Sequence, residues 1–233
     1  MKRLLNLFSV CMLLLGISAV ANASIINYDY DIMDDGNSFT SPFGGVTVYT
    51  FDGGPTLDWT RVSGEAGVVN DTVPLSYEAP NGVTERDQTN YFNVRPQYAA
   101  NGSKVADGSI QATFGTSYYN YFGLWWGSMD WYNSIAFYDG DTPVAFFEGD
   151  DVACGNGING WCADGNTTAF LTNRYVNFLD LPDFNSFIMT SSICSFEADN
   201  IAVGNVLVPE PMTMLLLGLG LLGLAGLRRR FKK

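Results

Sequence analysis

Short apolar runs recur along the middle of the chain, separated by turn residues. Between residues 24 and 207 no segment keeps the 3.6-residue spacing of an amphipathic helix, whereas runs rich in β-branched and aromatic residues alternate with Gly, Asn and Asp. The pattern therefore predicts an all-β domain, an antiparallel β-sandwich with jelly-roll or Greek-key connections. Strands are expected at 25–30, 46–51, 57–62, 91–94, 109–114, 121–126, 134–138, 143–147, 175–179, 186–190 and 194–203.

The clearest local unit is a hairpin within residues 134–147. The turn Asp139-Gly140-Asp141 separates two apolar runs, and Asp-Gly in that position is typical of a tight hairpin. Ile135 and Phe137 share one face of the first run, as expected of a strand with a single side toward the core. We expect this hairpin to lie centrally in its sheet.

The first 23 residues have the three-part order of a secretory signal peptide. Lys2 and Arg3 give a positive start, an apolar run follows from residue 4 to 20, and Ala21-Asn22-Ala23 supplies small residues for cleavage. The mature chain is therefore expected to begin near Ser24, with residues 24–207 forming one exported ectodomain.

Residues 208–233 form a second terminal signal. Pro209 and Pro211 prevent helix continuation, so the segment Val208, Pro209, Glu210 and Pro211 is expected to be extended and open to a protease. Residues 212–227 are predicted to form a transmembrane helix of about 24 Å, short for a bilayer core of about 30 Å. A basic stop follows and places the C-terminus in the cytoplasm. It consists of Arg228, Arg229, Arg230, Lys232 and Lys233.

The order of Pro-Glu-Pro, apolar segment and basic end resembles the sorting tail of exosortase-dependent surface proteins, the PEP-CTERM family. The resemblance covers only residues 208–233. It implies that an exosortase in the inner membrane recognises the tail and removes it near Pro209-Glu210-Pro211. The ectodomain would then reach the cell surface or the extracellular matrix. A plain tail anchor is the alternative, but an anchor does not need the tripeptide.

The net charge of the ectodomain limits the classes of partner that it can bind. Seven of the 12 basic residues but only one of the 24 acidic residues lie in the predicted signal peptide and tail, so the domain between them carries about −18. Such a domain repels phosphate backbones, and nucleic acid is not expected as a partner. Exopolysaccharide or cations are better candidates.

The chain has no histidine. Ser-His-Asp catalysis, Cys-His catalysis and His-ligated zinc are therefore excluded, and the ectodomain is not expected to be an enzyme. A pair of carboxyl groups could still cleave glycans, because glycosidases need only two acids at a set separation. That reading is kept as a third alternative, after a structural or adhesive role and a carbohydrate-binding module for exopolysaccharide.

Three cysteines lie in the exported part. Cys154 and Cys162 flank a glycine-rich loop, which favours a local disulfide in an oxidising compartment. Cys194 is left over in an apolar run, either as a buried thiol or as half of an intermolecular bridge.

Two further sets of residues are candidate binding sites. Alternation along residues 121–126 places Trp125 and Trp126 on opposite faces, so at least one of these rings is expected to be exposed or covered by a loop. Most of the aromatic side chains in this segment are expected to fill the core, and a glycan contact at Trp126, Trp131 and Tyr132 is the alternative. Dense aspartates in turns could bind one structural calcium, although solvated acidity is the commoner explanation. The calcium candidates are Asp139, Asp141, Asp150 and Asp199.

Overall fold

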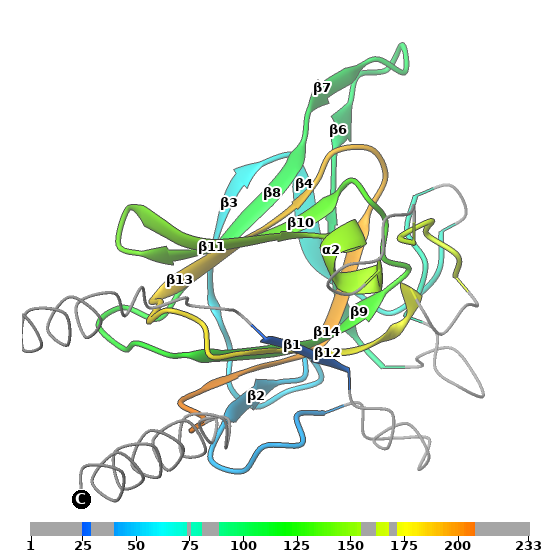
Figure 1. Cartoon of the computed structure of the whole chain (residues 1–233). Helices are drawn as coiled ribbons and strands as arrows, with labels where there is room; N and C mark the ends of the chain where they lie inside the picture. The colour runs from blue at the N-terminus through cyan, green and yellow to red at the C-terminus, as the bar shows by residue number, and fades with distance from the viewer. Residues whose placement is uncertain are drawn as a thin grey trace, which may run out of the picture.

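The structure, a computed structural model, describes residues 25–28, 40–73, 76–80, 89–154, 162–167 and 172–207 (Figure 1). Nearly all regular elements in these ranges are antiparallel β-strands, and the one α-helix among them is the short α2 (Gly149–Cys154). The all-β prediction is therefore confirmed. The predicted signal peptide and the predicted tail, including residues 212–227, lie outside the described residues.

A seven-stranded sheet has the order β1-β12-β9-β14-β5-β4, and β2 also pairs with β14. Its central strands β9 and β14 pair along most of their lengths, from Glu197 opposite Gly127 to Gly204 opposite Tyr121. The start of β14 therefore lies beside the end of β9, and the end of β14 lies beside the start of β9. The bounds are β1 (Ile25–Tyr28), β2 (Thr47–Tyr49), β4 (Glu65–Val69), β5 (Tyr91–Arg95), β9 (Tyr121–Gly127), β12 (Arg174–Leu179) and β14 (Phe196–Gly204).

A five-stranded sheet has the order β11-β10-β13-β8-β3. A separate two-stranded ribbon, β6 with β7, projects from one end of the molecule (Figure 1). The bounds of these strands are β3 (Asp58–Ser63), β6 (Gln97–Tyr98), β7 (Lys104–Ala106), β8 (Gly108–Thr113), β10 (Asn133–Asp139), β11 (Thr142–Glu148) and β13 (Ser186–Ser191).

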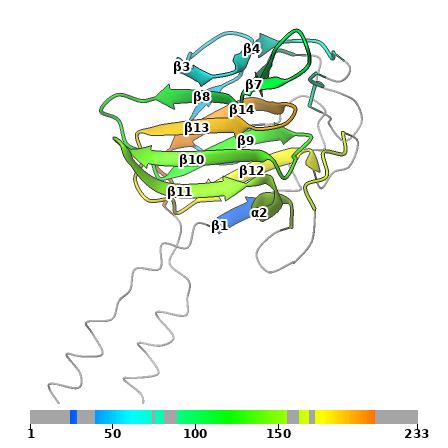
Figure 2. The same ribbon diagram turned by 90° about the horizontal axis from the view of Figure 1, so that it is seen from above.

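The two large sheets face each other across a shared aromatic core, and Figure 2 shows one behind the other. Phe122 of β9 contacts Phe187 of β13 and Phe137 of β10, with ring centroids 4.7 and 5.1 Å apart. All three side chains are fully buried. Edge-to-face contacts of this kind add to the hydrophobic gain from burying each ring.

Every predicted strand is present, with bounds that differ by a few residues. The turn of the 134–147 hairpin is also as predicted, because Asp139 pairs with Thr142 and Gly140 has φ +56°. The central placement of this hairpin is wrong, since β11 is the outer strand of its sheet. Pro143 provides the physical reason, because a proline lacks the N–H that a strand paired on both sides requires.

Candidate functional site

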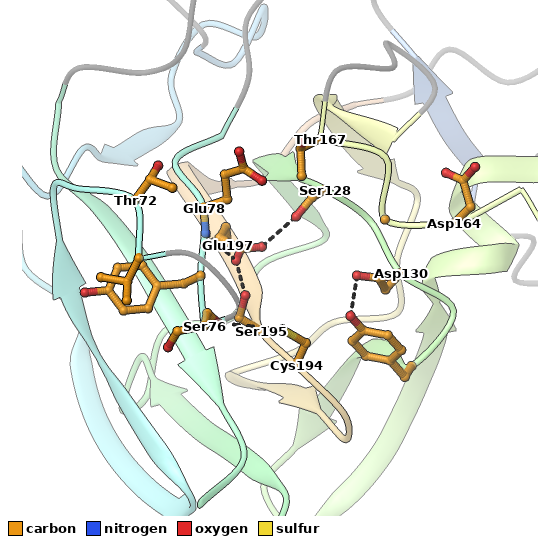
Figure 3. Close-up of a pocket in the computed structure, with 14 residues that line it drawn as sticks. Thr72, Ser76, Glu78, Ser128, Asp130, Asp164, Thr167, Cys194, Ser195 and Glu197 are labelled. Carbon is orange, nitrogen blue, oxygen red and sulfur yellow. Dashed lines mark hydrogen bonds between the residues drawn. The ribbon is translucent and has the colours of Figure 1, made fainter.

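A pocket of about 520 Å³ lies at the start of β14 (Figure 3). Its lining residues come from the ranges 72–73, 76–78, 128–132, 164–167 and 194–197. Its volume lies in the range of small-molecule sites, which is roughly 300–1,000 Å³.

Glu197 lies at the base of this pocket and is 1% exposed. Ser128 Oγ donates to Glu197 Oε2 at 3.0 Å, the Glu78 N–H donates to Oε1 at 3.3 Å, and Ser195 Oγ bonds Oε1 as well (Figure 3). Burial raises the pKa of Glu197 to about 8, although the two serine hydrogen bonds oppose the shift. The carboxyl group is therefore mostly protonated at neutral pH.

Asp130 is the second carboxyl group held within the pocket wall. Tyr132 Oη donates to Asp130 Oδ2 at 2.6 Å. Burial raises the pKa of Asp130 to about 6, the tyrosine hydrogen bond lowers it, and the negative charge of Asp164 raises it further. Burial and the bond to Asp130 together raise the pKa of Tyr132 above its ordinary value, so its hydroxyl remains a donor.

Two glycines at this end of the sheet lie very close to neighbouring residues. Asp130 forms an isolated antiparallel bridge with Asp164, and a Cβ on the neighbouring Gly165 would lie 2.3 Å from the Asp130 carboxylate. On the other side, a Cβ on Gly127 would lie 2.8 Å from Pro80. Any side chain at these two glycines would therefore displace its neighbour, and at Gly165 the positive φ of +64° favours glycine as well.

The charge of the lining limits the ligands that the pocket can take. Among the described residues no lysine or arginine lines it, whereas Glu78, Asp130, Asp164 and Glu197 do. An anionic ligand would meet carboxylates without any compensating cation. Hydroxyl groups of Thr72, Ser128 and Ser195 provide donors and acceptors that suit a neutral polar ligand.

Cys194 also lines this pocket, half-buried and without a disulfide partner. Its Sγ lies 3.7 Å from the Ser76 carbonyl oxygen. Burial is the largest cause of the raised pKa of this thiol, and the charges of Glu197 and Asp130 raise it further. Because the thiolate is the reactive form, Cys194 is a weak nucleophile in this environment.

The predicted glycan residues separate into two groups. Trp126 is fully buried and stacks on Phe196 at 4.5 Å, so it cannot contact a glycan; Trp125 is 1% exposed, so both rings are covered rather than exposed. Both rings are buried because β9 is a central strand that is covered on both faces. Trp131 is 42% exposed and packs edge-on against Tyr132 of the pocket wall, so these two rings do lie together.

The four calcium candidates do not converge. Asp139 accepts from Tyr118 Oη at the turn of the hairpin, whereas Asp150 follows its other end and accepts from the Ala163 N–H. Five residues of strand, about 17 Å, separate those two ends. Asp199 lies in the other sheet, opposite Trp125. No cluster of three or more Asp, Glu or Cys side chains able to hold a metal occurs in the described ranges; calcium binding itself stays a prediction.

The predicted disulfide between Cys154 and Cys162 is present. Cys154 ends helix α2, whose last carbonyls accept from a buried arginine: Arg174 Nη2 donates to the Val152 and Ala153 oxygens at 2.8 and 3.3 Å. A cation at a helix C-terminus is favoured by the helix dipole as well. Arg174 begins β12 opposite Trp126, so helix α2 and Cys154 lie at the same end of the sheet as the pocket.

Sequence reasoning did not identify Glu197, Ser128 and Ser195 as a connected group. One signal was present, because Glu197 lies inside an apolar strand, where a carboxylate needs hydrogen-bond partners. Its donors come from segments far apart in the chain, and no local pattern indicates which segments meet.

Comparison with protein-family models identifies a PEP-CTERM protein-sorting motif at residues 207–230. The motif confirms the resemblance seen in the sequence and indicates an exported protein that an exosortase processes after a membrane-anchored intermediate. A search of curated proteins gave no match. Within the part of the chain that the structure describes, no helix is long and apolar enough to cross a membrane.

Proposed function

We propose that this chain, which carries a PEP-CTERM protein-sorting motif, is a cell-surface or extracellular-matrix protein with a structural or adhesive, non-catalytic ectodomain. The two facing sheets support the predicted sandwich with jelly-roll or Greek-key connections. Such a fold presents loops at both ends of rigid strands, which suits a surface role.

The observation that carries the non-catalytic reading is the bonding of Glu197. A buried carboxylic acid beside a second carboxyl group is also what a glycosidase needs. Here, however, both oxygens of Glu197 are bonded by protein groups from three segments. The carboxyl group thus cross-links β14 to residue 128 and to residue 78, and its hydrogen-bonding capacity is used within the protein.

The processing part of the proposal is tested by replacing Pro209, Glu210 and Pro211 with alanine in the full chain. The apolar segment and basic stop remain, so insertion should be unchanged while removal of the tail is abolished. Mass spectrometry of the C-terminus and membrane fractionation measure the result. A triple variant trimmed at the wild-type bond would refute exosortase processing in favour of a general protease.

A carbohydrate-binding module for exopolysaccharide is the second candidate. The contact between Trp131 and Tyr132 beside the pocket supports it, because exposed aromatic faces stack on sugar rings and the pocket lining suits neutral hydroxyls. Incubating the processed protein with the exopolysaccharide of the producing cells separates the alternatives. Retention without cleavage favours the module, and release of shorter chains favours an enzyme. If the protein is not retained and no shorter chains are released, a purely structural role is favoured.

A further inference from the structure

The end of β14 opposite the pocket is fastened by two asparagines. Asn120 Oδ1 accepts from the Val206 N–H at 2.8 Å, and the Asn120 N–H donates to Asn205 Oδ1 at 3.1 Å. Asn205 Nδ2 in turn donates to the backbone carbonyl oxygen of Tyr118 at 3.2 Å. These bonds, named here the Asn clasp, hold the chain directly after the strand ends at Gly204.

Exposure changes sharply between the two residues that follow Asn205. Val206 packs against a small cluster formed by Tyr121, Leu179 and Ala202. Leu207, the next residue, is 93% exposed. The sorting motif begins at that same exposed residue 207.

The chain also enters the domain at this end. Ile25, the first residue of β1, lies opposite Leu179 of the same cluster. Nearby, the Leu181 N–H donates to the backbone carbonyl oxygen of Asn120 at 3.1 Å. The predicted signal peptide ends two residues before Ile25. Both predicted membrane-directed segments thus join the ectodomain at one end, and the pocket lies at the other.

We propose that the Asn clasp is a depth stop that positions the Pro-Glu-Pro segment for processing, an inference that rests on the proposed exosortase function. From Val206 to Pro209 is three residues, at most about 11 Å of extended chain. A folded domain fastened at Val206 cannot follow the tail into the bilayer. The domain outside and the basic stop inside therefore hold the tripeptide at the outer membrane surface from both directions.

An insertion between Leu207 and Val208 tests this proposal in the full chain. Eight Gly and Ser residues leave the tail and the fold unchanged but remove the fixed distance, because such a linker behaves as a flexible coil. Tail removal should slow by about ten-fold, as expected when a reacting bond loses its positioning. The same insertion between Asn101 and Gly102, in the exposed turn of the β6–β7 ribbon away from the clasp, should leave the rate unchanged.

Two substitutions at Asn120 test the clasp itself. Asn120→Ala removes the acceptor of the Val206 N–H and should slow processing, whereas Asn120→Asp keeps that acceptor and should restore the rate. Limited proteolysis of the full chain checks that the fold is retained. Wild-type rate and cleavage site in the linker variant would overturn the depth stop. If the triple-alanine variant is blocked in the same experiment, exosortase processing still stands.

Discussion

The two ends of β14 differ in chemistry as well as in position. At the clasp end, Asn120, Asn205 and backbone amides form a neutral network next to the sorting motif. At the pocket end, about 23 Å away along the strand, Glu197 and Asp130 have raised pKa values. The end that carries the tail should therefore be insensitive to pH and to reducing agents, whereas the pocket end should respond to both.

Loss of the disulfide should have the largest effect on stability. Replacing Cys154 and Cys162 with alanine frees a short loop in the unfolded chain and should lower the free energy of unfolding by about 2.5 kcal/mol. Denaturant titration measures the loss. Because Cys154 and Cys162 lie at the pocket end, the tail of the variant should still be removed at the wild-type bond. An altered cleavage site would show that the two ends are coupled.

A pH titration should give the next largest effect. Folded Glu197 keeps its proton up to about pH 8, whereas its pKa in the unfolded chain is near 4.5. The folded state therefore binds more protons between these values, and stability falls as pH rises through that window. Between pH 5 and pH 8 the free energy of unfolding should fall by on the order of 2 kcal/mol, a value already reduced to account for water that enters the pocket. Asp130 contributes in the same direction between its ordinary 3.8 and about 6.

Glu197→Gln is the matched variant for that titration. The amide has the size of the protonated acid and can bond the same serine hydroxyls, but it does not titrate. Melting temperatures of the variant should fall much less than those of the wild type between pH 6 and pH 8. An unchanged slope would mean that another group, and not Glu197, releases the proton.

The sequence predicted strands and turns correctly where an apolar run was followed by turn residues. The run Ile135 to Phe137 before Asp139-Gly140 gave both a strand and its turn. β4 was missed because Gly67 and Glu65 weaken its apolar pattern, yet five backbone pairs with β5 hold it in the sheet. The order of strands within a sheet was beyond local reasoning, because it depends on contacts between residues far apart in the chain.

The sorting tail and the pocket differ in how well the sequence alone predicts them. The sorting tail could be predicted, because its function depends on the linear order of Pro209, an apolar segment and a basic end. The pocket could not, because Ser128 and Glu197 meet only after β9 and β14 pair. Trp126 shows the matching limit of alternation, which identifies two faces of a strand but does not indicate whether one or both are covered.

Asn205→Ala should have a smaller effect. It removes two neutral hydrogen bonds near the surface, worth about 1 kcal/mol of unfolding free energy together. No titratable side chain takes part in these bonds, so the loss should be equal at pH 5 and pH 8. Thermal melts at both pH values measure it. A loss that depends on pH would contradict the neutral character of the clasp end.

Trp131→Ala should have the smallest effect on stability and the most informative effect on binding. The ring is 42% exposed, so its removal should cost less than about 0.5 kcal/mol. If the pocket end binds sugar rings, the variant should lose at least ten-fold in affinity for exopolysaccharide, because one stacking face is gone. Phe146→Ala is the control, since Phe146 is 56% exposed on the edge strand β11 and does not line the pocket. Sedimentation of protein with purified polysaccharide measures both variants. Equal retention of the two variants would remove Trp131 from the binding surface and leave the structural role as the better account of this end of the molecule.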